Sequence, residues 1–160
     1  MNVAEKSAKD AVRNISNNEI ENLLFHLLRT FYQFEQVEVM MFNLSYDLIY
    51  ILKLLKRIEG MRISDIAEEM KIKVFTATRL VDQLEKRTLV KRARTELDKR
   101  NVHVTITAAG KKMVRKIEDH ALKLIFSNMK EYSESEMLVV FNTIKNMDKI
   151  LGIEPGRYNF

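Results

Sequence analysis

Residues 61–92 read MRISDIAEEMKIKVFTATRLVDQLEKRTLVKR, and this stretch decides the fold. It predicts a short helix, SDIAEEM, with Ser64 as its N-cap residue. A brief turn around Lys71 and Ile72 leads to a second helix over residues 74–87. Two helices joined by a tight turn are typical of a helix-turn-helix unit.

The second of these helices has two chemically different faces. Its inward positions recur at helical spacing and are expected at Val74, Ala77, Leu80, Val81 and Leu84. The residues left on or near the open face are Lys73, Phe75, Thr76, Thr78, Arg79 and Gln83. Small polar and basic residues at the N-terminal end of such a helix are suited to contacts with DNA.

A charged hairpin is predicted immediately after the two helices, within RTELDKRNVHVTITAAG (94–110). Val102, Val104 and Ile106 alternate with polar residues, as expected for a strand. Glu96 to Arg100 then form the tip of the hairpin. A helix-turn-helix followed by a two-stranded hairpin is a winged helix, and we expect this domain to span residues 44–106.

Long helices are predicted on both sides of the winged helix. One begins near Asn17 or Asn18, either of which can cap it, and another covers residues 44–59 and closes at Gly60. Thr107 can cap a third long helix. The spacing of Ser133 and Glu136 predicts a capping box for a last helix, which is expected to run to Leu151 before Gly152 and Pro155 stop it.

The helices outside residues 44–106 are rich in Leu, Ile, Phe and Met and cannot bury their apolar faces alone. Packing against the same elements of a second copy would cover these faces. We therefore expect residues 1–43 and 107–160 to form a helical dimerisation region. The expected fold class is mainly α with a small β-hairpin.

Composition narrows the function classes. Four glycines and one proline among 160 residues favour a mostly helical protein. The absence of cysteine excludes disulfides and thiolate metal sites. No signal peptide or membrane-spanning segment is apparent, so a cytoplasmic protein with no membrane contact is expected.

Charge is unevenly distributed along the chain. The segment from Lys71 to Lys116 has fourteen Lys or Arg and four Asp or Glu, a net charge of +10, whereas the remainder carries −5. One explanation of this run of charges is a solvent-exposed face with no binding partner. Segregation on this scale is also the footprint of a polyanionic partner, here double-stranded DNA.

Three pieces of the sequence, taken in order, resemble the MarR family of bacterial and archaeal transcriptional regulators. They are TRLVDQLEKRTLVKR (78–92), the Asp98-x-Arg100 pair, and VTITAAG (104–110). The resemblance covers about residues 15–152. It implies a homodimer that binds pseudo-palindromic operator DNA, often as a repressor, and often leaves the DNA when a small ligand binds.

The resemblance also implies roles for individual residues. Thr76, Thr78 and Arg79 would face the major groove, while Arg100 would reach the minor groove, oriented by Asp98. Lys73, Lys91, Arg92, Arg94 and Lys99 fit phosphate contacts. Alternatively, Asp98 has only a structural role and starts a turn.

Two positions depart from the family pattern. Phe75 stands near a place where a small polar residue is common, so base readout is expected to differ there. Thr88 replaces the glycine that usually precedes Leu-Val, which is expected to alter the turn into the hairpin.

A small-molecule effector is expected from the family, in a cavity lined by Phe31, Phe42, Tyr46 and Tyr50. No metal or other cofactor is expected, because His26, His103 and His120 lack ligand spacing. Nothing resembles a catalytic set, so the chain is not expected to be an enzyme. Two rival functions stay open: a winged-helix module that binds an acidic protein, and an architectural DNA binder without sequence preference.

Overall fold

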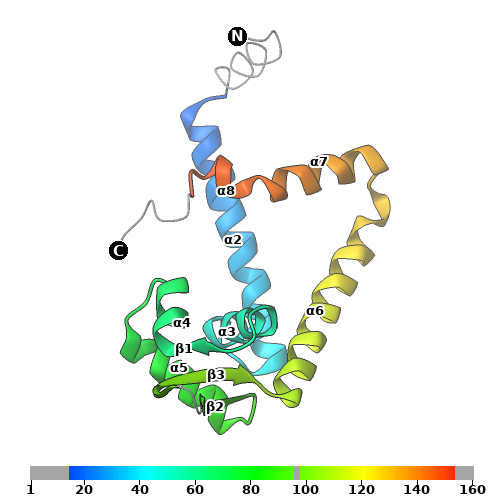
Figure 1. Ribbon diagram of the computed structural model, residues 1–160. Helices are drawn as coiled ribbons and strands as arrows, with labels where there is room; N and C mark the ends of the chain where they lie inside the picture. Colours follow the sequence, from blue (N-terminus) through cyan, green and yellow to red (C-terminus); the bar gives the residue numbers. More distant parts are fainter. Residues whose placement is uncertain (1–14, 96–97, 154–160) are drawn as a thin grey trace. The chain divides into compact units, whose positions relative to one another are not determined.

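The computed structural model describes residues 15–95 and 98–153, without the side chains of 94, 95 and 98–101 (Figure 1). The chain divides into two units, one up to Tyr46 and one from Asp47 onward. The helices and the hairpin that the sequence predicts are present, with differences at several ends, one additional short strand and one interrupted helix.

The first unit contains helix α2 (Asn17–Phe42), whose N-cap is Ser16. The Ser16 hydroxyl accepts a hydrogen bond from the Glu19 amide at 3.2 Å, and the Glu19 carboxylate accepts one from the Ser16 amide at 2.8 Å. The expectation of a cap at Asn17 or Asn18 is therefore wrong. Ser16 caps the helix because it has a glutamate three residues later, which allows a reciprocal capping box.

The second unit begins within α3 (Tyr46–Arg57) and combines a three-stranded sheet with helices. Its further elements are β1 (Met61–Arg62), α4 (Ile63–Glu69), α5 (Val74–Lys86), β2 (Val90–Thr95), β3 (Asp98–Ile106), α6 (Ala108–Asn128), the 3-10 turn η1 (Met129–Glu131), α7 (Glu134–Lys145) and α8 (Met147–Ile150). The α4–turn–α5 unit and the β2–β3 hairpin confirm the winged helix-turn-helix.

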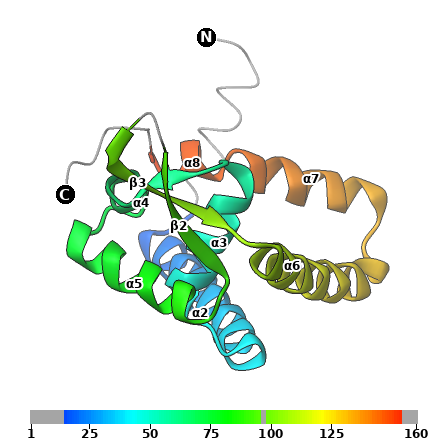
Figure 2. The same ribbon diagram turned by 60° about the horizontal axis from the view of Figure 1, so that its bottom comes forward.

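The sheet is antiparallel in the order β1-β3-β2 (Figure 2). Val90 of β2 lies opposite Ile106 of β3, and Met61 of β1 lies opposite Val104. Strand β1 was not expected, since two residues are too short to show an alternating pattern. It ties the start of α4 to the base of the hairpin.

The core of the second unit is apolar and lies where the sequence places it. Helix α3 buries five residues, and Ala77, Leu80, Val81 and Leu84 of α5 are buried as expected. Ile66, Val104, Val114 and Ile117 complete the core from α4, β3 and α6. This packing fixes α5 on its apolar side and leaves the opposite side open.

Two expectations about α4 and α5 are wrong. Helix α4 is capped at Arg62 rather than Ser64, because the Asp65 carboxylate accepts a hydrogen bond from the Arg62 amide at 3.2 Å. Val74 is 55% exposed instead of buried. It is the first residue of α5, at the margin of the apolar stripe, where no further turn of helix precedes it.

The junction between the hairpin and α6 is closely packed. Thr107 caps α6 by accepting a hydrogen bond from the Gly110 amide at 3.0 Å, as the sequence predicts. The Thr107 amide donates to the Leu89 carbonyl at 3.0 Å. A Cβ atom on Gly110 would lie 2.1 Å from that same carbonyl oxygen, so only glycine fits at this position.

The last predicted helix is interrupted. The capping box of Ser133 and Glu136 is present, but α7 ends at Lys145 and α8 begins at Met147. Asn146 lies between them, and its side-chain amide donates to the Asn142 carbonyl at 2.8 Å. A side chain that bonds to the backbone in this way competes with helical hydrogen bonding, which explains the break.

Candidate nucleic-acid interface

The turn between α4 and α5 brings the two helices of the helix-turn-helix together. The Ile72 amide donates to the Ala67 carbonyl at 2.9 Å, and Lys71 adopts a left-handed backbone with φ of 53°. The chain then enters α5 through Lys73, its N-cap residue. This geometry exposes the N-terminal end of α5, which is the part of a recognition helix that contacts bases.

Helix α5 presents basic, polar and apolar groups on its open side. Lys73 and Arg79 are exposed, whereas Thr76 and Thr78 are half-buried at its margins. Phe75 is 62% exposed and lies four residues before Arg79, on the same face of the helix. The open face that the sequence predicts is therefore confirmed for Lys73, Phe75, Thr76, Thr78 and Arg79.

The hydroxyl of Thr78 is already engaged within the helix. It donates a hydrogen bond to the Val74 carbonyl at 2.9 Å. A threonine hydroxyl has one hydrogen to donate and two acceptor sites. In this conformation Thr78 can therefore offer an outside partner an acceptor and its methyl group, but no donor.

Arg92 links the hairpin to α5 through two carboxylates. Its guanidinium contacts Asp82 at 2.6 Å and Glu85 at 2.5 Å, and its backbone amide donates to Glu85 at 3.1 Å. Partial burial by itself lowers the pKa of Arg92, but the hydrogen bonds with Asp82 and Glu85 outweigh it and raise the pKa. Arg92 was expected to contact phosphate, and its two carboxylate partners on α5 were not expected.

Four of the expected DNA contacts are in the hairpin: Arg94, Asp98, Lys99 and Arg100. Their backbone forms parts of β2 and β3, with Thr95 opposite Asp98. Their side chains lie outside the described residues, as do Glu96 and Leu97 at the tip. The predicted pairing of Asp98 with Arg100 stays a prediction.

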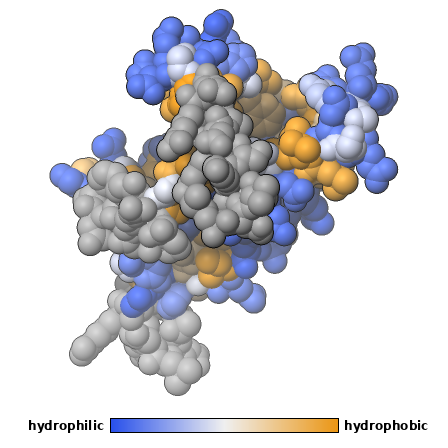
Figure 3. Space-filling model, turned by 90° about the horizontal axis from the view of Figure 1, so that it is seen from above, coloured by the Kyte–Doolittle hydropathy of each residue, from blue (hydrophilic) through white to orange (hydrophobic). Residues whose placement is uncertain are grey.

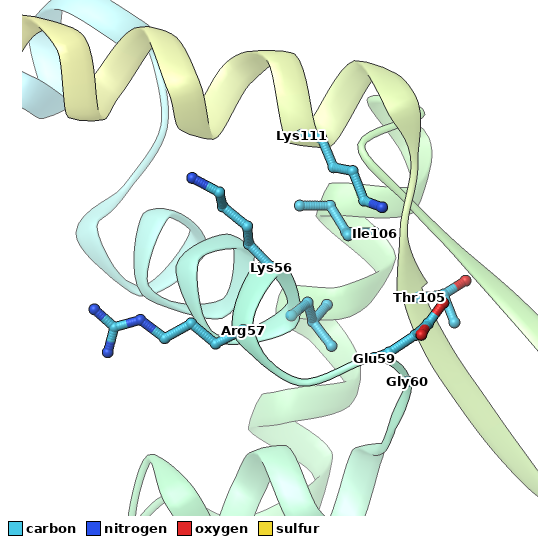
Figure 4. Close-up of a pocket in the computed structure, with 8 residues that line it drawn as sticks. Lys56, Arg57, Glu59, Gly60, Thr105, Ile106 and Lys111 are labelled. Atoms are coloured by element: carbon cyan, nitrogen blue, oxygen red, sulfur yellow. The ribbon is translucent and has the colours of Figure 1, made fainter.

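A pocket of about 290 Å³ lies at the base of the hairpin, between α3, β3 and the start of α6 (Figure 4). It is lined by Leu55, Lys56, Arg57, Glu59, Gly60, Thr105, Ile106 and Lys111. In Figure 4, Lys56 extends toward α6, where it forms an ion pair with Glu118, while Arg57 extends away from the hairpin. This pocket is polar and differs from the effector cavity that we expected.

The residues expected to line an effector cavity are distributed over both units. Phe31 is exposed on α2, while Tyr46 and Tyr50 are partly exposed on α3. The Tyr50 hydroxyl donates to the Glu69 carboxylate at 3.5 Å. None of these residues, nor Phe42, lines the pocket in Figure 4.

Over residues 15–95 and 98–153, no group of three or more His, Asp or Glu side chains could hold a metal ion. Within the same residues, no helix is both long and apolar enough to cross a membrane.

Comparison with known proteins agrees with this geometry. The sequence pattern of the MarR family matches residues 44–102, which are the winged helix. The uncharacterized HTH-type transcriptional regulator YfiV of Bacillus subtilis is 30% identical over 114 residues, covering 71% of each chain. The chain belongs to the MarR family. It is a helix-turn-helix transcriptional regulator, and not an enzyme.

Another sequence relative and two solved structures are also similar to this chain. SarZ of Staphylococcus aureus is 29% identical over 106 residues, which are 64% of this chain and 70% of SarZ. The structure of a MarR family protein from Bacillus stearothermophilus has a TM-score of 0.75 at 18% identity, over 84% of this chain and 94% of its own. Streptococcus pneumoniae FabT, solved in complex with DNA, has a TM-score of 0.72 at 19% identity, over 83% and 97% of the two chains.

Proposed function

We propose that this MarR protein is a homodimeric repressor that binds a pseudo-palindromic operator in double-stranded DNA. The observation that carries the proposal is the open side of α5, where Lys73, Arg79 and Thr78 surround the exposed end of a helix-turn-helix. The DNA complex of FabT and the oligodeoxyribonucleotide complex of a MepR variant are of the same fold.

Contacts with base edges and contacts with phosphates would have different roles. Arg79 has the planar set of donors that suits the major-groove edge of guanine, and Thr76 and Thr78 can reach neighbouring bases. Lys73 and Lys91 are exposed and suit phosphate contacts, which position the protein without reading sequence. Arg100, oriented by Asp98, would reach the adjacent minor groove, and Arg94 and Lys99 would contact phosphates beside it.

The dimer is supported by apolar side chains that the described chain leaves open. Helix α7 buries none of its residues, and its apolar side chains Leu138, Val139, Phe141 and Ile144 are all more than half exposed. Figure 3 shows orange hydrophobic side chains among hydrophilic ones on one face of the molecule. We propose that residues 1–43 and 107–160 cover such faces by packing against a second copy.

An effector that releases the DNA is part of the proposal. Phe31, Phe42, Tyr46 and Tyr50 remain its candidate contacts, and their aromatic rings would suit an apolar or aromatic small molecule. Screening compounds for loss of operator binding would identify that molecule.

Selection of binding sites from a random DNA pool at near-physiological salt tests the function. Enrichment of an inverted repeat, with half-sites about one helical turn apart, is the expected result. Salt-sensitive binding with no enriched sequence would instead identify an architectural DNA binder. Absence of DNA binding by a folded dimer would favour a module that binds an acidic protein.

A further inference from the structure

The N-terminal end of α5 carries two exposed apolar side chains. Phe75 is 62% exposed and Val74 is 55% exposed, although both belong to a helix whose other side is buried in the core. We call these two residues the apolar patch of α5.

The surroundings of the patch indicate what kind of partner covers it. Exposed Lys71 and Lys73 precede it, and exposed Arg79 follows Phe75 by one turn on the same face. The centres of protein–protein interfaces are depleted in charged residues, and Lys in particular is rare there. An apolar patch among cations therefore fits a polyanion that also offers small apolar groups.

The major groove of DNA is such a surface. Among the base edges in that groove, thymine contributes a C5-methyl group, while the other edges offer hydrogen-bond donors and acceptors. Phenylalanine and other apolar side chains can contact this methyl group. The phosphates beside the groove attract the flanking cations.

We propose that Val74 and Phe75 contact thymine methyl groups and thereby select A·T base pairs under the N-terminal end of α5. This inference rests on the proposed function and specifies which bases the same surface reads. Thr78 adds a methyl group near this end and, with its hydroxyl hydrogen bonded to the Val74 carbonyl, offers no donor in competition. Arg79 would read an adjacent guanine.

The test replaces each thymine of the selected operator, one at a time, with deoxyuridine. Deoxyuridine keeps the base pair and the O4 acceptor and lacks only the methyl group. Burial of one methyl group is worth roughly a fourfold change in affinity. We expect a three- to tenfold loss at one or two positions in each half-site and no change elsewhere.

The variants Phe75→Ala and Val74→Ala assign the effect to the patch. Both residues are exposed, so the variants should keep the wild-type thermal unfolding midpoint. At each sensitive position, Phe75→Ala or Val74→Ala should bind the thymine and deoxyuridine operators equally. Ile58→Ala, which removes an exposed apolar side chain outside α5, should retain the wild-type discrimination.

Three results would overturn the inference. One is a wild-type protein for which no position of the half-sites is sensitive to deoxyuridine, a result that includes an operator without thymine there. Another is that Phe75→Ala and Val74→Ala both still discriminate at every sensitive position. The third is a change of oligomeric state in Phe75→Ala, which would make the patch an interface between copies. If the protein still binds the selected operator tightly in these three cases, the proposed function stands. If no DNA sequence is selected at all, both the inference and the proposed function are overturned.

Discussion

Arg92 of β2 is bound by Glu85 of α5 through both its backbone amide and its guanidinium, at 3.1 and 2.5 Å. Asp82, one turn earlier on α5, holds the other side of the same guanidinium at 2.6 Å. The hairpin and the recognition helix are thus joined by one side chain, whose positive charge also pairs with two carboxylates beside the proposed DNA surface.

We expect Arg92→Ala to weaken operator binding by about tenfold, because Asp82 and Glu85 are left as unpaired negative charges near phosphate. Stability should fall by only about 1 kcal/mol, since the three side chains are partly exposed to solvent. Equilibrium binding and urea unfolding measure the two effects.

Lys91→Ala is the matched control, because it removes one positive charge from the neighbouring residue of β2. Its loss of affinity should be smaller and the same for all DNA sequences. Equal losses in Lys91→Ala and Arg92→Ala would show that Arg92 acts only through its charge, contrary to the expectation.

Thr88 has a left-handed backbone with φ of 58°, a conformation that a β-branched residue rarely adopts. The resemblance implies glycine at this position, and glycine adopts a left-handed backbone without steric strain. We expect Thr88→Gly to stabilise the protein by roughly 0.5–1 kcal/mol, because the strain of about 1–2 kcal/mol exceeds the entropy cost of glycine.

Urea unfolding of Thr88→Gly and of Lys86→Gly makes the comparison. Lys86 ends α5 in ordinary helical structure, so glycine there should destabilise the protein by up to about 1 kcal/mol. A loss of stability in both variants would mean that the left-handed turn at Thr88 is not strained.

Gly110 lies against the Leu89 carbonyl, which also accepts a hydrogen bond from the Thr107 amide at 3.0 Å. A methyl group in Gly110→Ala would lie 2.1 Å from that oxygen. We expect a loss of about 3 kcal/mol or more, because both the helix and the hairpin would have to shift. Thermal unfolding reports it, and Ala109→Ser, at the exposed neighbouring position, should change stability by less than about 0.5 kcal/mol.

The proposed dimer predicts that charge on the apolar side of α7 separates the subunits. Phe141→Glu combined with Ile144→Glu should give a folded monomer by light scattering and circular dichroism, with operator binding lost. Asn142→Glu adds a negative charge to the same exposed helix and should remain a dimer. A dimer that survives the double substitution would place the interface elsewhere.

Sequence patterns predicted the parts of the fold that repeat over several turns or strands. Ala77, Leu80, Val81 and Leu84 all lie in the core, and Thr107 and Ser133 both cap helices. Prediction failed at the N-terminal ends of α2 and α4, where a neighbouring residue forms the cap, and for the very short strand β1.

The candidate site was predictable in part. The open face of α5 followed from helical periodicity, but the exposure of Val74 did not, because position 74 has no preceding turn to set its environment. The contacts of Arg92 with Asp82 and Glu85 depend on how β2 passes α5, which no local pattern encodes.

The central claim is that two copies of α5 enter successive major grooves on one side of the DNA. The most direct measurement compares affinity for the selected inverted repeat with affinity for the same repeat after insertion of about five base pairs between its half-sites. Half a helical turn places the second half-site on the opposite side of the duplex, so we predict that affinity falls to the level of a single half-site. Equal affinity for both DNAs would contradict a rigid dimer that reads two half-sites through α5.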